Sequence, residues 1–248
     1  MISLKWMTTL LALGMTLSVT AETQRTVFTV ENQFPRWEQI EVGAVYNFRE
    51  RATGFTSADI YEISPYIRYG FREHIALQLN VPYVEVDPTF GPSNSGIGDV
   101  SLTIQLRAYE DIFGYPYFIP HLTVTFPTGD EDKGLGAGDA TVKAGISYGD
   151  KIYNHLSYVI DGSYRIRPDN DNQFIFSLSV LWHVSPQLDF IFEARYQDEG
   201  DFDEGDVLLF LGGMIYDWTE NLQMGVHAGT GSSGDTDAIA QIRFSYTF

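Results

Sequence analysis

The chain has 248 residues, a formal net charge of −18, 15% aromatic residues, 23 glycines and no cysteine. This length suffices for one folded domain or one closed barrel. The lack of cysteine excludes disulfide scaffolds, zinc–thiolate sites and thiol catalysis, and the acidic excess argues against nucleic acid, whose phosphates would repel the chain.

Residues 1–21 have the pattern of a secretory signal peptide. Lys5 precedes an uncharged stretch from Trp6 to Val19, and small residues follow up to Ala21. A membrane-spanning helix would need about 20 apolar residues, and threonines and serines already dilute this stretch. We therefore expect export, with cleavage after Ala21.

The next segment, 22–37, precedes the regular pattern of the rest of the chain. It contains four apolar residues, Val27, Phe28, Val30 and Phe34, without a strand-like period. The sequence leaves open whether this segment plugs the interior of the domain that follows or hangs in the periplasm.

From about residue 38 to 248, apolar and polar residues alternate with a period of two, which is typical of strands with one apolar and one polar face. The predicted strands span 38–48, 59–69, 74–86, 99–109, 117–127, 140–148, 154–166, 173–184, 188–197, 207–217, 222–231 and 237–248. Each is close to the roughly 9–11 residues that cross a bilayer at a tilt.

The connections supply a second indication, because long and short ones alternate. The longer ones are 49–58, 87–98, 128–139 and 198–206, and the short ones are 70–73, 149–153, 185–187 and 218–221. Outer-membrane barrels have short periplasmic turns and longer outer loops, and an even strand number leaves both termini periplasmic. The sequence thus predicts an all-β fold, a transmembrane antiparallel β-barrel of about 12 strands at 38–248, with both termini periplasmic.

The polar face of each strand should line the lumen. Six acids and six bases fall on this face: Glu41, Glu62, Asp99, Asp161, Asp189 and Glu193, and Arg68, Arg107, Lys143, Arg165, Arg195 and Arg243. Two interpretations stay open: the charges pair and plug the barrel, or they line a narrow wet pore that orients polar or anionic solutes. We favour the pore, with inward Tyr66, Tyr109 and Tyr117 suited to aromatic solutes.

The candidate residues of the solute pathway follow from this face. They are Glu62, Arg68, Arg107, His121, Lys143, Asp161, Arg165, Glu193, Arg195 and Arg243. The expected function is that of an outer-membrane channel or transporter for small solutes. The alternatives are a structural or adhesive barrel and, with less support, an outer-membrane hydrolase.

The glycine-rich stretch 127–139 could bind phosphate, bind a cation or form a hairpin tip. No helix follows it, so the dinucleotide-binding interpretation fails, and the EF-hand pattern lacks its third ligand and distant glutamate. We interpret it as an outer acidic loop that faces anionic lipopolysaccharide. Asp130 and Asp132 remain weak candidates for a divalent cation, and no other metal site is expected.

The last strand ends in alternating aromatic residues, Phe244, Tyr246 and Phe248. This ending resembles the signal that outer-membrane proteins present to the barrel-assembly machinery, although Arg243 stands at its glycine position. The expected partners are therefore outer-membrane lipid, lipopolysaccharide, this assembly machinery and an unidentified small solute.

No catalytic pattern accompanies the strands. The chain has neither a Gly-x-Ser-x-Gly elbow nor a His-Glu-x-x-His pair, and no two of its five histidines have metal-ligand spacing on one strand. We expect neither enzymatic activity nor a cofactor.

Three glycine–aspartate motifs carry a family resemblance: Phe126-Pro-Thr-Gly-Asp130, Gly96-Ile-Gly-Asp99 and Gly136-Ala-Gly-Asp139. Together with the turn Trp218-Thr-Glu-Asn221 and the terminal aromatic, they resemble the outer-membrane transporter family filed under the meta-pathway of phenol degradation. The resemblance covers about 38–248 and implies passage of small, often aromatic or hydrophobic compounds. In these motifs glycine would allow a tight bend, and aspartate would cap nearby backbone donors.

Overall fold

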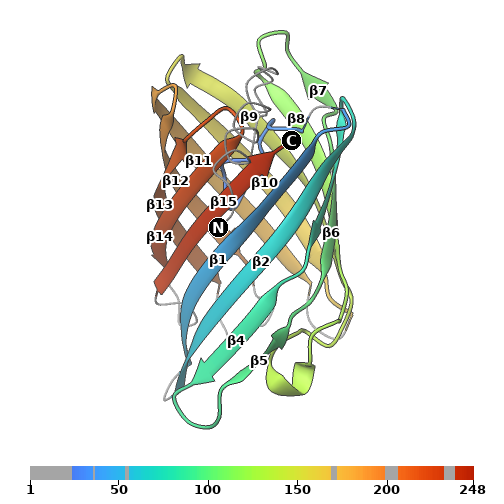
Figure 1. Ribbon diagram of the computed structural model, residues 1–248, viewed down its shortest axis with the longest axis vertical. Coiled ribbons are helices and arrows are strands. Elements are labelled where there is room, and N and C mark those ends of the chain that lie inside the picture. The colour runs from blue at the N-terminus through green and yellow to red at the C-terminus, as the bar shows by residue number, and fades with distance from the viewer. Residues whose placement is uncertain (1–23, 36, 54–55, 169–171, 199–205, 232–237) are drawn as a thin grey trace, which may run out of the picture.

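The computed structural model describes residues 24–35, 37–53, 56–168, 172–198, 206–231 and 238–248. These residues form a closed antiparallel β-barrel with twelve wall strands (Figure 1). The first strand, β1 (Ile40–Thr53), pairs with β2 (Thr56–Arg72) and with the last strand, β15 (Ala238–Thr247), which closes the wall. The predicted barrel architecture is therefore confirmed.

Two wall strands are interrupted. The third consists of β3 (Ile75–Asn80) and β4 (Tyr83–Pro88), which both pair with β2. The fourth consists of β5 (Asn94–Ile97) and β6 (Ser101–Leu106). A two-residue extension, β7 (Tyr109–Glu110), pairs with β8 (Tyr117–Thr125).

From β8 onward each strand pairs with the next along the chain. These strands are β9 (Thr141–Tyr153), β10 (Leu156–Ile166), β11 (Gln173–Ser185), β12 (Leu188–Gln197), β13 (Val207–Asp217), β14 (Leu222–Gly231) and β15. None of the described residues forms a helix long and apolar enough to cross a membrane.

The strand alternation separates two faces. Phe192 on the outer face is 61% exposed, whereas the next residue, Glu193, is 3% exposed in the lumen. Exposed phenylalanine, leucine and isoleucine side chains cover the outside of most wall strands. This arrangement suits a wall that faces lipid, because a polar lumen needs water or hydrogen-bond partners that lipid does not offer.

The start of β1 and the end of β15 lie at the same end of the barrel, because Phe248 N–H donates to Ile40 O at 2.8 Å. We call this the inner end, and the opposite end, with the loop 126–140, the outer end (Figure 1). That the inner end faces the periplasm stays a prediction.

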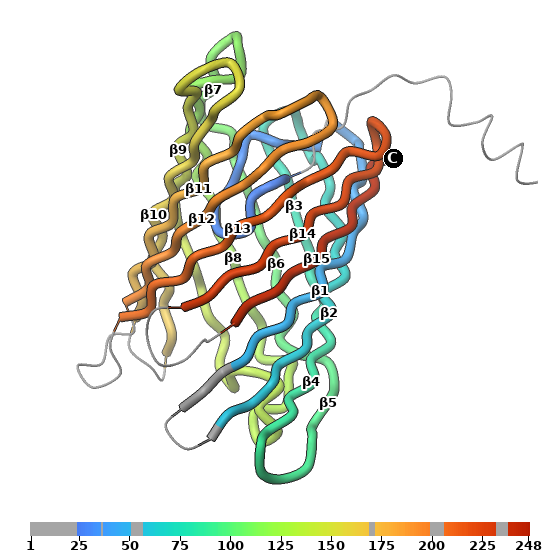
Figure 2. Tube along the Cα trace, turned by 90° about the vertical axis from the view of Figure 1, so that its left-hand side faces the viewer, coloured from blue at the N-terminus to red at the C-terminus, as the bar shows by residue number. Residues whose placement is uncertain are grey.

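Three predicted connections are wrong in their bounds, and one of them, 87–98, contains the end of β4 and all of β5. The hairpin of β1 and β2 continues to the pair Thr53 and Thr56, so 49–58 is mostly strand, and β9 includes all of 149–153. A strand that projects beyond the lipid needs no apolar face, so its sequence loses the alternation that revealed the other strands. Figure 2 shows the β1–β2 and β4–β5 hairpins reaching past the rest of the wall at the outer end.

The glycine-rich stretch forms an ordered loop with the short 3₁₀ helix η1 (Glu131–Lys133). Asp99 accepts hydrogen bonds from Gly129 N–H at 2.9 Å and from Ala137 N–H at 2.7 Å. A Cβ at Gly129 would lie 2.5 Å from Leu135 O, so only glycine fits there. The three family motifs thus meet at the break between β5 and β6, and Asp99, predicted in the lumen wall, instead fastens this loop.

Two neighbouring charges of the loop pair with each other. Lys133 Nζ lies 2.6 Å from Asp130 Oδ2, and this hydrogen bond lowers the pKa of Asp130 and raises the pKa of Lys133. Among the described residues no group of three or more acidic or histidine side chains could hold a metal ion. The weak cation site at Asp130 and Asp132 therefore gains no support from its geometry.

Candidate functional site

The N-terminal segment, residues 24–35, lies inside the lumen and is held there by inward side chains. The backbone N–H groups of Val27 and Phe28 donate to the Glu193 carboxylate at 3.0 and 3.1 Å. Arg243 donates to Gln24 O at 2.7 Å and to Thr26 O at 3.3 Å. These bonds satisfy polar backbone groups that enter the barrel without a neighbouring strand.

Side chains of the segment make further bonds to the wall. Arg25 forms ion pairs with Asp189 at 2.7 Å and with Asp217 at 3.3 Å. Thr29 Oγ1 lies 2.9 Å from Ser179 Oγ. The segment is therefore bound along its length rather than at one point.

The inner end of the lumen contains an apolar cluster. Phe34 is 4% exposed and packs in a cluster with inward side chains of the wall. The wall residues of this cluster are Ala76, Tyr117, Ile119, Val159, Leu181, Ile191 and Ile215. Arg68 and Arg107 lie over the Phe34 ring, with their Cζ atoms 5.5 and 4.8 Å from its centroid. The segment thus packs against the inner end of the lumen through a hydrophobic contact.

The predicted pathway residues are distributed along the lumen rather than gathered at one site. Arg68 pairs with Glu41 at 3.4 Å, and Arg107 pairs with Glu110 at 2.7 Å, both near the inner end. Glu62 lies nearer the outer end, 3.7 Å from Arg49. Glu193 and Arg243 hold the N-terminal segment, as described above.

The remaining predicted residues, His121, Lys143, Asp161, Arg165 and Arg195, belong to the middle and outer half of the lumen. His121 Nε2 lies 2.6 Å from Asp161 Oδ2, which also accepts a hydrogen bond from Ser147. Lys143 and Arg165 lie opposite each other on β9 and β10. The guanidinium of Arg195 lies over the ring of Phe28, with Cζ 4.1 Å from its centroid.

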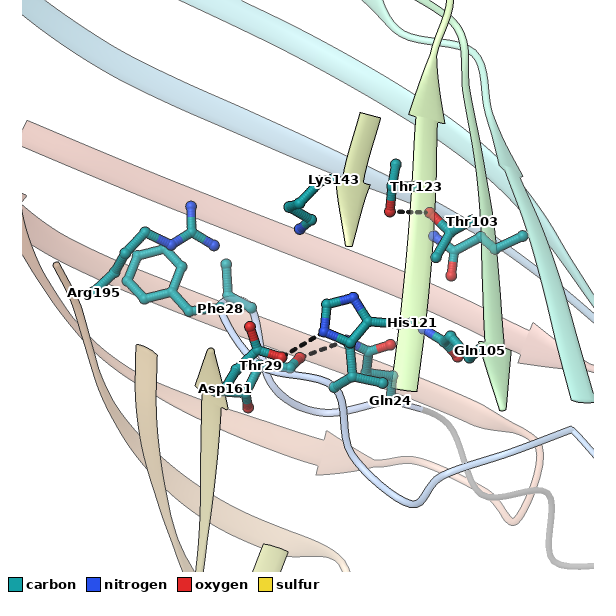
Figure 3. A pocket seen from close by; sticks show the side chains of 13 residues that line it. Gln24, Phe28, Thr29, Thr103, Gln105, His121, Thr123, Lys143, Asp161 and Arg195 are labelled. Atoms are coloured by element: carbon teal, nitrogen blue, oxygen red, sulfur yellow. Dashed lines mark hydrogen bonds and ion pairs between the residues drawn. The ribbon is translucent and has the colours of Figure 1, made fainter. Parts of the chain in front are cut away.

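A polar cavity of about 130 Å³ lies between the N-terminal segment and this part of the wall (Figure 3). Its floor includes Val27, Phe28 and Val30, and its walls include Thr103, Gln105, Thr123, Lys143 and Arg195. Figure 3 shows Arg195 beside the ring of Phe28, and Lys143 between Arg195 and Thr123 in this view. The arrangement can hold a small polar molecule beside an aromatic surface.

Of the twelve lumen charges that the sequence predicts, Glu41 and Arg68 are the one pair in direct contact among the described residues. Three of the six acids bind the N-terminal segment or a histidine instead, namely Asp161, Asp189 and Glu193. The wall charges therefore do not plug the lumen by pairing with one another, and residues 24–35 occupy part of the lumen instead.

The predicted position of one aromatic residue, Tyr109, in the lumen is wrong. Tyr109 is 50% exposed and packs edge-on against Phe118 of the outer face, with ring centroids 6.2 Å apart. The chain is irregular between Arg107 and Tyr109, so Arg107 and Glu110 both point inward and the alternation shifts by one residue. Tyr66 and Tyr117 lie in the lumen as predicted, Tyr66 donating to Glu41 at 2.7 Å.

A second hydrogen-bonded chain lies near the inner end. Ser157 Oγ is 3.0 Å from His183 Nε2, and His183 Nδ1 is 2.8 Å from Asp189 Oδ1. This order of groups is that of a serine hydrolase triad. However, Ser157 is 0% exposed, and Asp189 also binds Arg25, so the chain also serves to hold the N-terminal segment.

Comparison with solved structures gives the fold. An outer membrane channel from Pseudomonas putida F1 superposes with a TM-score of 0.73 at 15% identity, over 92% of this chain and 100% of that one. The KdgM porin gives 0.56 at 10% identity, over 83% of this chain and 99% of that one. The CymD monoaromatic hydrocarbon channel gives 0.53 at 9% identity, over 86% and 89%. The fold is that of outer-membrane barrel channels.

The family follows from the sequence itself. A family described as "Putative MetA-pathway of phenol degradation" matches residues 39–248, and the chain belongs to this family. The predicted resemblance is thus confirmed. Among curated proteins none matches the chain.

Proposed function

We propose that the protein is an outer-membrane channel that passes small solutes, aromatic or hydrophobic compounds among them. The observation that carries this proposal is the polar cavity within the barrel, which the N-terminal segment lines together with the wall strands. A lumen that is closed by a bound segment can open without breaking the hydrogen-bonded wall. The family membership and the channel fold of the structural neighbours support the same conclusion.

The experiment is conductance in a planar bilayer, comparing the mature chain with a variant that lacks residues 24–35. The deleted residues belong to no wall strand, so the barrel hydrogen bonds remain. We expect stepwise ohmic currents that are larger or more frequent in the deletion variant. Silence of both proteins, with folding verified, would contradict a channel and favour a structural or adhesive barrel.

A hydrolase is the alternative that one observation favours, namely the chain of Ser157, His183 and Asp189. We propose that the protein is not an enzyme, because a nucleophile with no exposed surface has no access to a substrate. Hydrolysis of p-nitrophenyl esters should not exceed the detergent background in wild type or in Ser157→Ala. Activity that disappears in Ser157→Ala would overturn this part of the proposal.

The proposed location also extends to export and assembly. Residues 1–21 would direct secretion, and the C-terminal aromatics Phe244, Tyr246 and Phe248 would be recognised by the barrel-assembly machinery. Lipid and lipopolysaccharide would surround the wall. Processing after Ala21 can be checked by N-terminal sequencing of the protein purified from outer membranes.

A further inference from the structure

Charge in the lumen is segregated along the barrel axis. The acids of the middle and inner lumen already have hydrogen-bond or ion-pair partners: Asp161 binds His121, Asp189 binds Arg25, and Glu193 binds backbone N–H groups. Toward the outer end, Lys143, Arg165 and Arg195 come from three strands, near the start of β9 and near the ends of β10 and β12. Positive charge therefore accumulates on the outer side of the N-terminal segment.

Two of these cations have no carboxylate partner. Among the described residues no acidic oxygen lies within 4.0 Å of Lys143 Nζ or of the Arg195 guanidinium nitrogens. The Nε of Arg195 is buried, and it has no hydrogen-bond partner in the part of the chain that the structure describes. A buried or partly buried cation without a counter-charge is costly, and an anion with suitable geometry removes that cost.

The surroundings of the two cations limit what the anion can be. Arg195 lies on the ring of Phe28, which forms the apolar floor of an otherwise polar lining that also includes Asp161, paired with His121. The walls offer the hydroxyl groups of Thr103 and Thr123, which bond to each other at 2.9 Å. The site thus combines an anion-binding edge with an apolar floor, in a space of about 130 Å³.

We propose that this cavity is a binding site for small organic carboxylates, whose charged group lies between Lys143 and Arg195 and whose apolar body lies against Phe28. Arg165, which donates to Gln173 at 3.1 Å, adds to the positive potential from the next strand. The inference rests on the proposed channel function, because it names the class of solute that the lumen holds before passage. An inorganic anion would satisfy the charges but leave the apolar floor uncovered.

The test is isothermal titration calorimetry of the purified full-length protein in detergent, with sodium benzoate as the probe. Benzamide is the uncharged comparison and inorganic phosphate the anion without an apolar body. We expect saturable benzoate binding. Benzamide should bind about tenfold more weakly or worse, as the loss of one charge-assisted hydrogen bond implies, and phosphate should bind about tenfold more weakly because it buries no apolar surface against Phe28. The affinity should fall at about 1 M salt, where the screening length is roughly 3 Å.

The variants Lys143→Met and Arg195→Gln should each weaken benzoate binding about tenfold, and Lys143→Arg should restore it. Lys151→Met is the matched control, because it removes the same charge from the same strand near the inner end, where Lys151 lies over the Tyr115 ring. Heat-modifiable gel mobility verifies that each barrel is folded. Equal affinities for benzoate and benzamide, or equal affinities in wild type and both cavity variants, would overturn the proposal.

Equal affinity for phosphate and benzoate would overturn the proposed class of ligand, since the apolar floor would then contribute nothing. The two proposals fail separately. Benzoate binding by a protein that never conducts contradicts the channel and leaves the site intact. Conductance without benzoate binding contradicts the site and leaves the channel intact.

Discussion

At the scale of single residues, inward glycines determine how closely lumen side chains approach the wall. Gly149 lies opposite Tyr117 on β8, and an added Cβ would overlap the tyrosine ring. Gly145 plays the same part beside His121, whose ring a Cβ would meet at 2.6 Å. Because the ring of His121 can lean across Gly145, it reaches Asp161 two strands away.

Gly149→Ala should therefore destabilise the barrel by about 1–3 kcal/mol, the usual cost of overpacking a tight site. The matched control is Gly162→Ala on β10, where no atom lies within 4 Å of an added Cβ. The control should change stability little or increase it slightly. Urea unfolding of both variants, followed by gel mobility, measures the difference in their unfolding midpoints. Equal midpoints would show that the Tyr117 ring moves away from the added methyl group without loss of stability.

The sequence does not indicate which side chains the lumen residues contact. Alternation placed His121 and Asp161 on the lumen face, but their contact depends on the register of β8, β9 and β10. Register depends on the hydrogen bonds between neighbouring strands, so the sequence of a single strand does not specify it. The same holds for the break between β5 and β6, where Asp99 turns from the wall to the loop backbone.

At the scale of elements, the two faces of one strand differ by what surrounds them. Val124 lies opposite Leu102 on the outer face, and the neighbouring Thr123 lies opposite Thr103 in the lumen. Val124→Arg should cost about 2–4 kcal/mol near the membrane midplane, because arginine must leave water for lipid. Thr123→Arg should cost clearly less. The folded fraction in lipid vesicles at increasing urea measures both, and equal penalties would mean that the outer face does not contact lipid.

Periodicity predicted the strands because most of them have one apolar and one polar face. It missed the apolar inner end of the lumen, although the signal was present. Apolar residues run consecutively at Val180-Leu181-Trp182 and at Phe190-Ile191-Phe192, where the alternation breaks. Such runs indicate a strand buried on both faces, and here Phe34 supplies the second buried face. No such signal indicated that residues 24–35 lie in the lumen. Several of their bonds to the wall come from backbone groups, and these groups are the same whatever the residue type.

At the scale of the whole molecule, the predicted orientation of the barrel in the membrane can be tested by labelling. The chain has no cysteine, so single cysteines can be introduced without background. Asp132→Cys in the outer loop should react with a membrane-impermeant maleimide in intact cells. Asn154→Cys, exposed in the turn between β9 and β10, should react after the outer membrane is permeabilised. The opposite labelling pattern would reverse the predicted topology.

The position of the N-terminal segment also determines the order in which the molecule can be completed. Residues 24–35 are made before any wall strand, yet their partners Ser179, Glu193 and Arg243 lie on β11, β12 and β15. The earliest part of the described chain therefore obtains its full set of bonds last, when β15 has paired with β1. The bonds of this first segment thus depend on the last strand of the chain, and a chain that stops short of β15 has neither a closed wall nor the Arg243 anchor.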